Sequence, residues 1–183
     1  FSRWTLNPRA PAFEETLDTL THELMHRYGS YVHRRDEGGI VRADLLGREA
    51  SHWSFLFDSD ASVLYGNDWR DLGGGNFESI DTLHRYSALD QYLAGWISAS
   101  EVGPMRLLQS AAADPGALPR RGARIAATVS EITLAQIIAA EGPRLPAAGS
   151  AQRSYRAGWV LLRRPGQTLT AELLPQLEAT RRA

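Results

Sequence analysis

The chain has 183 residues and 43% of them are apolar, so it can bury one hydrophobic core, and we expect a single domain over residues 1–183. The 20 basic and 21 acidic residues leave a formal net charge of −1, which gives no electrostatic case for binding nucleic acid or an anionic membrane. Because cysteine is absent, disulfides and thiolate metal sites are excluded, and a metal would need histidine, carboxylate or water ligands.

The apolar runs are too short to span a bilayer, and the first residues do not form a signal-peptide pattern. The chain begins at Phe1 without an initiator methionine, which suggests a trimmed domain or a mature fragment. We expect no membrane span and a monomeric protein.

The first predicted element is an amphipathic helix that begins near Asn7 or Pro8 and ends at Gly29. Its apolar positions recur at helical spacing and are Phe13, Leu17, Leu20 and Leu24. On a helical wheel they fall opposite His22 and His26. One face of the helix would therefore anchor it, while the other would look into a cleft.

This helix carries an H-E-x-x-H motif, His22-Glu23-Leu24-Met25-His26. Residues four apart lie on one face of a helix, about 6 Å apart along its axis, so both imidazoles can bind a single cation. Glu23 would lie beside the open coordination position, where a general base acts. The motif predicts a zinc site with His22 and His26 as ligands and Glu23 as the catalytic base.

The middle of the chain is predicted as irregular β structure. The expected elements are a loop at 34–39, a short helix at 43–50, strands at 52–57 and 61–65, and, after turns and glycine-rich loops, a strand ending near Phe77. Asn67 and Glu78 have the end-to-end spacing of an EF-hand calcium loop. Trp69 and Leu72 stand where that loop needs an oxygen ligand and glycine, so turns explain the acidic residues of this region better.

The second half begins with a predicted helix over 87–97 and a linker over 114–122. Beyond the linker we expect a strand at 124–129, a helix at 134–140, a strand at 155–162 and a helix at 170–181. Ser130 or Thr133, with Glu131 or Gln136, would cap the helix at 134–140. The predicted fold class is α+β, with a small C-terminal lobe over 120–183 as the alternative to one domain.

A catalytic zinc needs a third protein ligand, and Asp90 is the preferred candidate. It lies in a mostly apolar predicted helix, where a buried carboxylate needs a partner. The alternative is that Asp90 caps its helix or pairs with an arginine such as Arg85. His52 is the rival, either as the third ligand or as a donor to the oxyanion that forms during attack.

Other candidates have weaker support. His33 follows the motif one residue later than the metzincin pattern requires, because Val32 occupies the expected position. Tyr92 and Tyr86 are further oxyanion donors, although on a straight helix only Tyr86 shares the face of Asp90. His84 lies in a polar run and is the weakest candidate.

Four segments together resemble a group of exported bacterial zincin-like proteins: residues 22–28, 51–54, 86–95 and 137–144. The arrangement also resembles gluzincins and aspzincins, in which a second helix brings a glutamate or an aspartate to the zinc. This resemblance implies a zincin-like peptidase fold, a third ligand at Asp90, and secretion or a cell-surface location.

The expected function is a zinc metallopeptidase, more specifically an endopeptidase, that acts on a peptide or protein substrate. Glu23 would take the proton of the attacking water, and His52 or a tyrosine such as Tyr92 would stabilise the oxyanion. Two alternatives stay open: a zincin-shaped binding or adhesion module without turnover, and a structural domain that carries the motif by chance.

Overall fold

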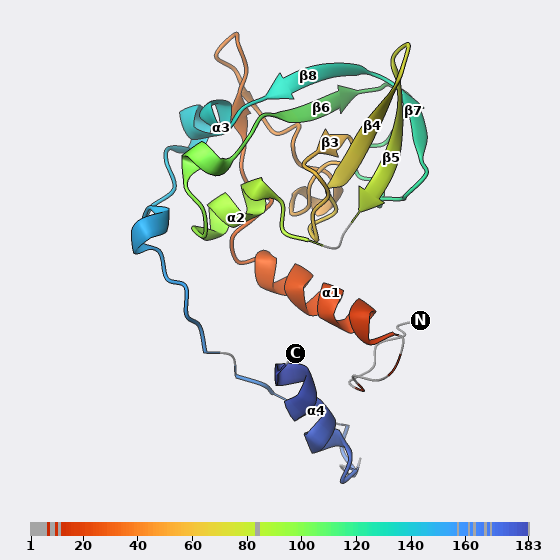
Figure 1. The fold of residues 1–183 in the computed structure, drawn as a ribbon, viewed down its shortest axis with the longest axis vertical. Coiled ribbons are helices and arrows are strands. Elements are labelled where there is room, and N and C mark those ends of the chain that lie inside the picture. Colours follow the sequence, from red (N-terminus) through yellow and green to blue (C-terminus); the bar gives the residue numbers. More distant parts are fainter. Residues whose placement is uncertain are drawn as a thin grey trace. The chain divides into compact units, whose positions relative to one another are not determined.

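A computed structural model describes residues 7, 10, 12–82, 85–156, 158–160, 162, 164–166, 168 and 170–182 (Figure 1). The chain forms two compact units, His22–Arg153 and a second unit made of Phe1–Thr21 with Ser154–Ala183. This division differs from the alternative C-terminal lobe over 120–183, because residues 124–132 supply two strands to the main sheet of the larger unit.

The larger unit is built on a six-stranded sheet with the order β7-β5-β4-β3-β6-β8. Its strands are β3 (Phe57–Asp58), β4 (Asn67–Gly73), β5 (Asn76–Thr82), β6 (Met105–Gln109), β7 (Arg124–Ala126) and β8 (Thr128–Ile132). Only β3 and β4 pair in parallel, so the sheet is mixed. A separate antiparallel pair joins β1 (Arg34–Arg35) to β2 (Val41–Arg42). Mixed strands and helices confirm the predicted α+β class.

The core of this unit is built from side chains of the sheet, of the helices and of the loops that precede β4. Its largest fully buried apolar side chains are Trp53, Trp69, Phe57, Met25, Leu45, Leu64, Leu89, Leu108, Ile132 and Ile137. Burying aromatic and branched side chains of this size supplies most of the favourable free energy of folding. Three of them, Trp53, Phe57 and Leu64, belong to the segment 52–64, so this largely irregular segment is anchored in the core.

Short helices flank the sheet, and their ends follow from local sequence. Helix α2 (Ala88–Ala94) begins at a capping box formed by Ser87 and Asp90 and ends at Gly95, which adopts φ 81°. Helix α3 (Leu134–Glu141) begins at a second capping box, formed by Thr133 and Gln136. Both boxes satisfy backbone N–H groups that have no partner inside the helix. The capping roles predicted as alternatives for Asp90 and Thr133 are therefore confirmed.

Helix α1 (Phe13–Met25) carries the H-E-x-x-H motif, and its backbone continues in hydrogen-bonded turns to Gly29, where Gly29 N–H donates to Met25 O at 3.0 Å. The predicted apolar anchor is only partly correct. Leu20 is 38% exposed and Leu24 is 52% exposed, whereas Met25 is fully buried. Met25, on a different side of the helix from Leu24, anchors its C-terminal turn in the core.

Several predicted elements of the middle region are absent or shorter. Residues 43–50 contain only a 3₁₀ turn at Arg48–Ala50, and the two strands predicted at 52–57 and 61–65 reduce to β3. Left-handed φ values at Asp60, Ala61 and Tyr65 bend the chain out of extended conformation. Strand β5 also runs on to Thr82 instead of ending near Phe77.

The smaller unit contains helix α4 (Leu173–Arg182), close to the helix predicted at 170–181. The strand predicted at 155–162 does not form among its described residues, 155–156, 158–160 and 162. In the part of the chain that the structure describes, no helix has the length and apolar character needed to cross a membrane.

A close backbone approach at Gly47 yields a prediction about stability. A Cβ there would lie 2.4 Å from Pro115 O and 2.8 Å from Ser54 Cα, which are backbone atoms. We expect Gly47→Ala to lower the free energy of unfolding by roughly 1–3 kcal/mol, the usual cost of overpacking. The matched control is Gly103→Ala, where a Cβ meets nothing within 4 Å. Chemical denaturation of both variants measures the difference; equal stabilities would contradict the packing at Gly47.

Candidate metal centre

Three histidines from two separate segments converge in the larger unit. The Nε2 atom of His22 lies 3.1 Å from Nε2 of His26 and 3.2 Å from Nε2 of His52. His22 lies in the last turn of α1, His26 directly follows the helix, and His52 lies in the loop before β3. One ligand atom from each of the three lies within 4.8 Å of the others. His22 and His26 are half-buried and His52 is buried.

The spacing of these nitrogen atoms fits a tetrahedral metal. With Zn–N bonds of 2.0–2.1 Å, two ligand nitrogens of a tetrahedral zinc are about 3.3 Å apart. The separations of His22 Nε2 from the Nε2 atoms of His26 and His52 are both within about 0.2 Å of this value. The three imidazoles are therefore placed for one small cation.

Hydrogen bonds to backbone carbonyls fix the protonation of two of these rings. Nδ1 of His22 lies 2.6 Å from Val63 O, and Nδ1 of His52 lies 3.0 Å from Arg48 O. A carbonyl oxygen only accepts, so each Nδ1 carries the proton and each neutral ring keeps a lone pair on Nε2. Two lone pairs facing each other repel unless a cation or a proton lies between them. The same pattern of Nδ1 donation orients histidine ligands in metal sites.

Electrostatics favour the neutral, ligand form of these histidines. Burial lowers the pKa of His26 and of His52, and the neighbouring imidazoles lower both pKa values further. The carboxylate of Glu49 acts in the opposite direction on both pKa values, and that of Glu23 does so on His26. Glu49 was not identified from the sequence. It lies in the turn just before His52 and adopts a left-handed φ of 58°.

Tyr65 is a second neighbour that sequence reasoning missed. Its ring stacks on His52 with centroids 4.3 Å apart and planes 13° apart, and it lies 5.0 Å from the ring of His22. Tyr65 adopts a φ of 72°, which is unfavourable for a bulky residue. The only sequence signal is its place before Gly66, because no motif marks a tyrosine in such a turn. The stacking limits the rotation of the His52 ring.

Asp90, the preferred third ligand, is not brought to the histidines. Its carboxylate is fully buried, and it accepts hydrogen bonds from Trp53 Nε1 (2.9 Å), Ser62 Oγ (2.7 Å), Ser87 N (2.8 Å) and Ser87 Oγ (2.9 Å). Burial raises the pKa of Asp90, and these donors act against that increase. These polar protein groups are the partners of the buried Asp90 carboxylate. His52 is the third residue that lies beside His22 and His26.

Asp90 still acts on the histidine cluster, because two of its hydrogen-bond donors lie next in the sequence to His52 and to Val63. Trp53 follows His52 directly, and Ser62 precedes Val63, whose carbonyl accepts from His22. One carboxylate thus ties together the loop that carries His52 and the loop that orients His22. Asp90 is a positioning residue in this structure.

The remaining candidates lie in other contacts. His33 is half-buried, and its Nδ1 lies 2.7 Å from Glu141 Oε1, at the C-terminal end of α3. The hydroxyl of Tyr92 accepts from Arg144 N at 3.0 Å, and the ring of Tyr86 packs on Trp96. His84 lies outside the described residues. These contacts engage His33 and Tyr92 with partners other than the three histidines.

Comparisons with known proteins leave the site to be interpreted from its geometry. No protein-family model matches the chain, and neither a curated protein nor a solved structure matches it. The chemical argument therefore rests on the three imidazoles and the groups around them.

The lowered histidine pKa values predict a pH dependence of stability in the metal-free protein. The unfolded chain takes up protons near the ordinary value of 6.5, whereas folded His26 and His52 resist protonation. Their contribution to stability is therefore present above pH 6.5 and is lost as the pH falls below it. We expect the difference in free energy of unfolding between wild type and the His26→Gln/His52→Gln variant to shift against the wild type between about pH 7.5 and 5. Denaturant titrations with a chelator present measure this, and a difference that does not change with pH would contradict it.

Proposed function

We propose that this chain binds one Zn²⁺ through His22, His26 and His52 and hydrolyses peptide bonds. The observation that supports the metal most directly is the approach of Nε2 atoms to 3.1 and 3.2 Å while two of the rings already donate from Nδ1. Imidazole suits zinc, and three protein ligands leave the fourth position open, as in catalytic zinc sites. With His52 in place of Asp90 in the ligand set, the predicted chemistry is unchanged.

Zinc held by the three histidines would have two effects: it would lower the pKa of a bound water and polarise a scissile carbonyl. Glu23 supports the peptidase assignment. It lies on α1 next to His22, its side chain is exposed, and its charge raises the pKa of His26, which indicates that its carboxylate lies near the cluster. In the proposed reaction Glu23 takes the proton of the attacking water and later delivers it to the leaving amine.

The proposal removes one expected role of His52. Its Nδ1–H donates to Arg48 O, and its Nε2 would bind the metal, so no N–H is left to stabilise an oxyanion. A different group must supply that hydrogen bond. The resemblance to exported zincin-like proteins supports a protein or peptide substrate outside the cell or at its surface.

The assignment of Glu23 is tested by replacing it with glutamine. We expect Glu23→Gln to keep the fold and one zinc per chain while reducing peptide hydrolysis at least about a hundredfold, the scale of a lost general base. Glu15→Gln, an exposed change on the same helix, is the control. Turnover is measured on a quenched-fluorescence peptide library with zinc-loaded protein and repeated with a chelator.

Two results, one of them from a further variant, Glu49→Gln, measured in the same assay, would contradict the proposal. Glu49→Gln reducing turnover more than Glu23→Gln would move the general base to Glu49. A zinc-loaded parent protein that cleaves no peptide in the library would favour the binding module without turnover.

The ligand set is tested by zinc affinity in three variants. We expect His52→Ala to weaken zinc binding most, because it removes a ligand. Asp90→Asn should weaken it by no more than roughly 10–100-fold, the range for residues that act through a ligand. His33→Ala should leave the affinity unchanged, since His33 pairs with Glu141. Competition with a chromophoric chelator measures each constant, with circular dichroism to confirm folding. A folded Asp90→Asn protein that loses more affinity than His52→Ala would restore the aspartate as the ligand.

A further inference from the structure

Three aspartates converge at a second place in the larger unit. One carboxylate oxygen from each of Asp58, Asp60 and Asp68 lies within 4.8 Å of the others. Asp58 ends β3 and Asp68 lies in β4, which pairs with β3 in parallel, while Asp60 lies in the intervening loop. The contiguous EF-hand pattern fails in this region, and these three residues come together through strand pairing instead.

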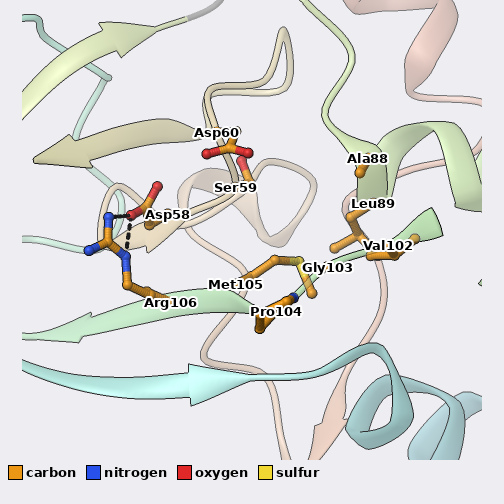
Figure 2. Close-up of a pocket in the computed structure, with 10 residues that line it drawn as sticks. All are labelled: Asp58, Ser59, Asp60, Ala88, Leu89, Val102, Gly103, Pro104, Met105 and Arg106. Atoms are coloured by element: carbon orange, nitrogen blue, oxygen red, sulfur yellow. Dashed lines mark hydrogen bonds and ion pairs between the residues drawn. The ribbon is translucent and has the colours of Figure 1, made fainter. Parts of the chain in front are cut away.

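A buried hydroxyl without a partner lies in the same cluster. Ser59 is only 5% exposed, and its Oγ makes no hydrogen bond within the part of the chain that the structure describes. Figure 2 shows this side chain directed toward the carboxylate of Asp60. A buried hydroxyl that lacks a partner costs about 1–3 kcal/mol, so its place among three carboxylates needs an explanation. A bound cation would accept this oxygen as a ligand.

The cluster borders a cavity that has room for an ion and water. The cavity has a volume of about 110 Å³, and Asp58, Ser59 and Asp60 line it on one side (Figure 2). Leu89 and Met105 are among the residues on the other side. A water occupies about 30 Å³ in the liquid, so an ion with a few waters fits this space.

Among the described residues, a basic side chain forms a salt bridge with this cluster at Asp58. Arg106 Nε donates to Asp58 Oδ2 at 2.8 Å, and Trp69 N donates to Asp58 Oδ1 at 3.3 Å. Burial raises the pKa of Asp58 and of Asp68, and the charge of Asp60 raises the pKa of Asp68 further. Among the described residues, no basic side chain donates a hydrogen bond to Asp60 or Asp68 as Arg106 does to Asp58. The charges of Arg85 and Arg106 lower the pKa of Asp68 without a hydrogen bond, so the negative charge is least compensated at Asp60 and Asp68.

We propose that Asp58, Ser59, Asp60 and Asp68 form a calcium site, completed by water. Carboxylate and hydroxyl oxygens are hard donors that suit Ca²⁺ rather than zinc. With Ca–O distances of 2.3–2.6 Å, oxygens on one calcium lie at most about 5 Å apart, which the cluster satisfies.

The site would close the loop between β3 and β4. That loop contains Val63, whose carbonyl accepts from His22, and Tyr65, which stacks on His52. Calcium at Asp60 and Asp68 would hold the two ends of this segment together. The calcium site is independent of the proposed peptidase activity, because its ligands are separate from the three histidines.

Isothermal titration of CaCl₂ into zinc-loaded and zinc-free protein tests the proposal. We expect one site with a dissociation constant of about 10⁻⁵–10⁻³ M, within the range for protein calcium sites, and a higher melting temperature with CaCl₂ than with MgCl₂. Asp60→Asn and Asp68→Asn should each weaken binding at least roughly tenfold, because both reduce the ligand charge. Ser59→Ala should weaken it less, without removing any hydrogen bond that the described part of the calcium-free fold makes.

The control is Asp71→Asn, an exposed change on β4 that keeps the acceptor for Gly73 N. It should bind calcium as the wild type does. Folded wild-type protein with neither heat of binding nor a thermal shift would overturn the proposal. Calcium binding unchanged in both Asp60→Asn and Asp68→Asn would also overturn it, because the ion would then lie elsewhere.

Discussion

The buried carboxylate of Asp90 is the interaction on which the arrangement of the larger unit depends. Moving a carboxylate out of water is costly, and at this position four hydrogen bonds offset that cost. The donors come from three separate segments, at Trp53, Ser62 and Ser87. Because a buried acceptor deprived of donors is strongly unfavourable, these segments cannot move independently. The anion therefore fixes loops that have little regular secondary structure.

The hydrogen bonds to Asp90 also determine the geometry of the histidine cluster. The last turn of α1 fixes His22 relative to His26, but His52 reaches them only if its loop returns to the helix. Gly29 allows the close approach, since a Cβ there would lie 3.0 Å from Leu64 and 3.6 Å from Asp90 Oδ1. The carbonyls of Val63 and Arg48 then orient two of the rings. Rigid outer contacts of this kind hold ligands in place before a metal binds.

Sequence reasoning predicts what local pattern controls. The motif helix, α2 and both capping boxes follow from residues within four positions of each other. The third member of the cluster does not, because it depends on left-handed turns at Glu49, Asp60 and Tyr65, where glutamate and tyrosine give no signal and aspartate only a weak one. The apolar surroundings of Asp90 in the sequence indicate a carboxylate that needs partners. One of these partners can also be predicted locally, because Ser87 lies three residues before Asp90 in the capping-box pattern.

The loop between β3 and β4 connects two kinds of donor chemistry. Its Val63 carbonyl and Tyr65 ring face imidazoles, which suit zinc, while its ends carry carboxylates and a hydroxyl, which suit calcium. In the two proposed sites, donor type would therefore select the metal, and neither site would need to exclude the wrong metal by size. Ser62, in the same loop, donates to Asp90, and a Cβ on Gly66 would lie 2.2 Å from Ser59 Oγ. A segment with so many close contacts has little freedom to relax. Any group that orders its ends therefore also orders the carbonyl that orients His22.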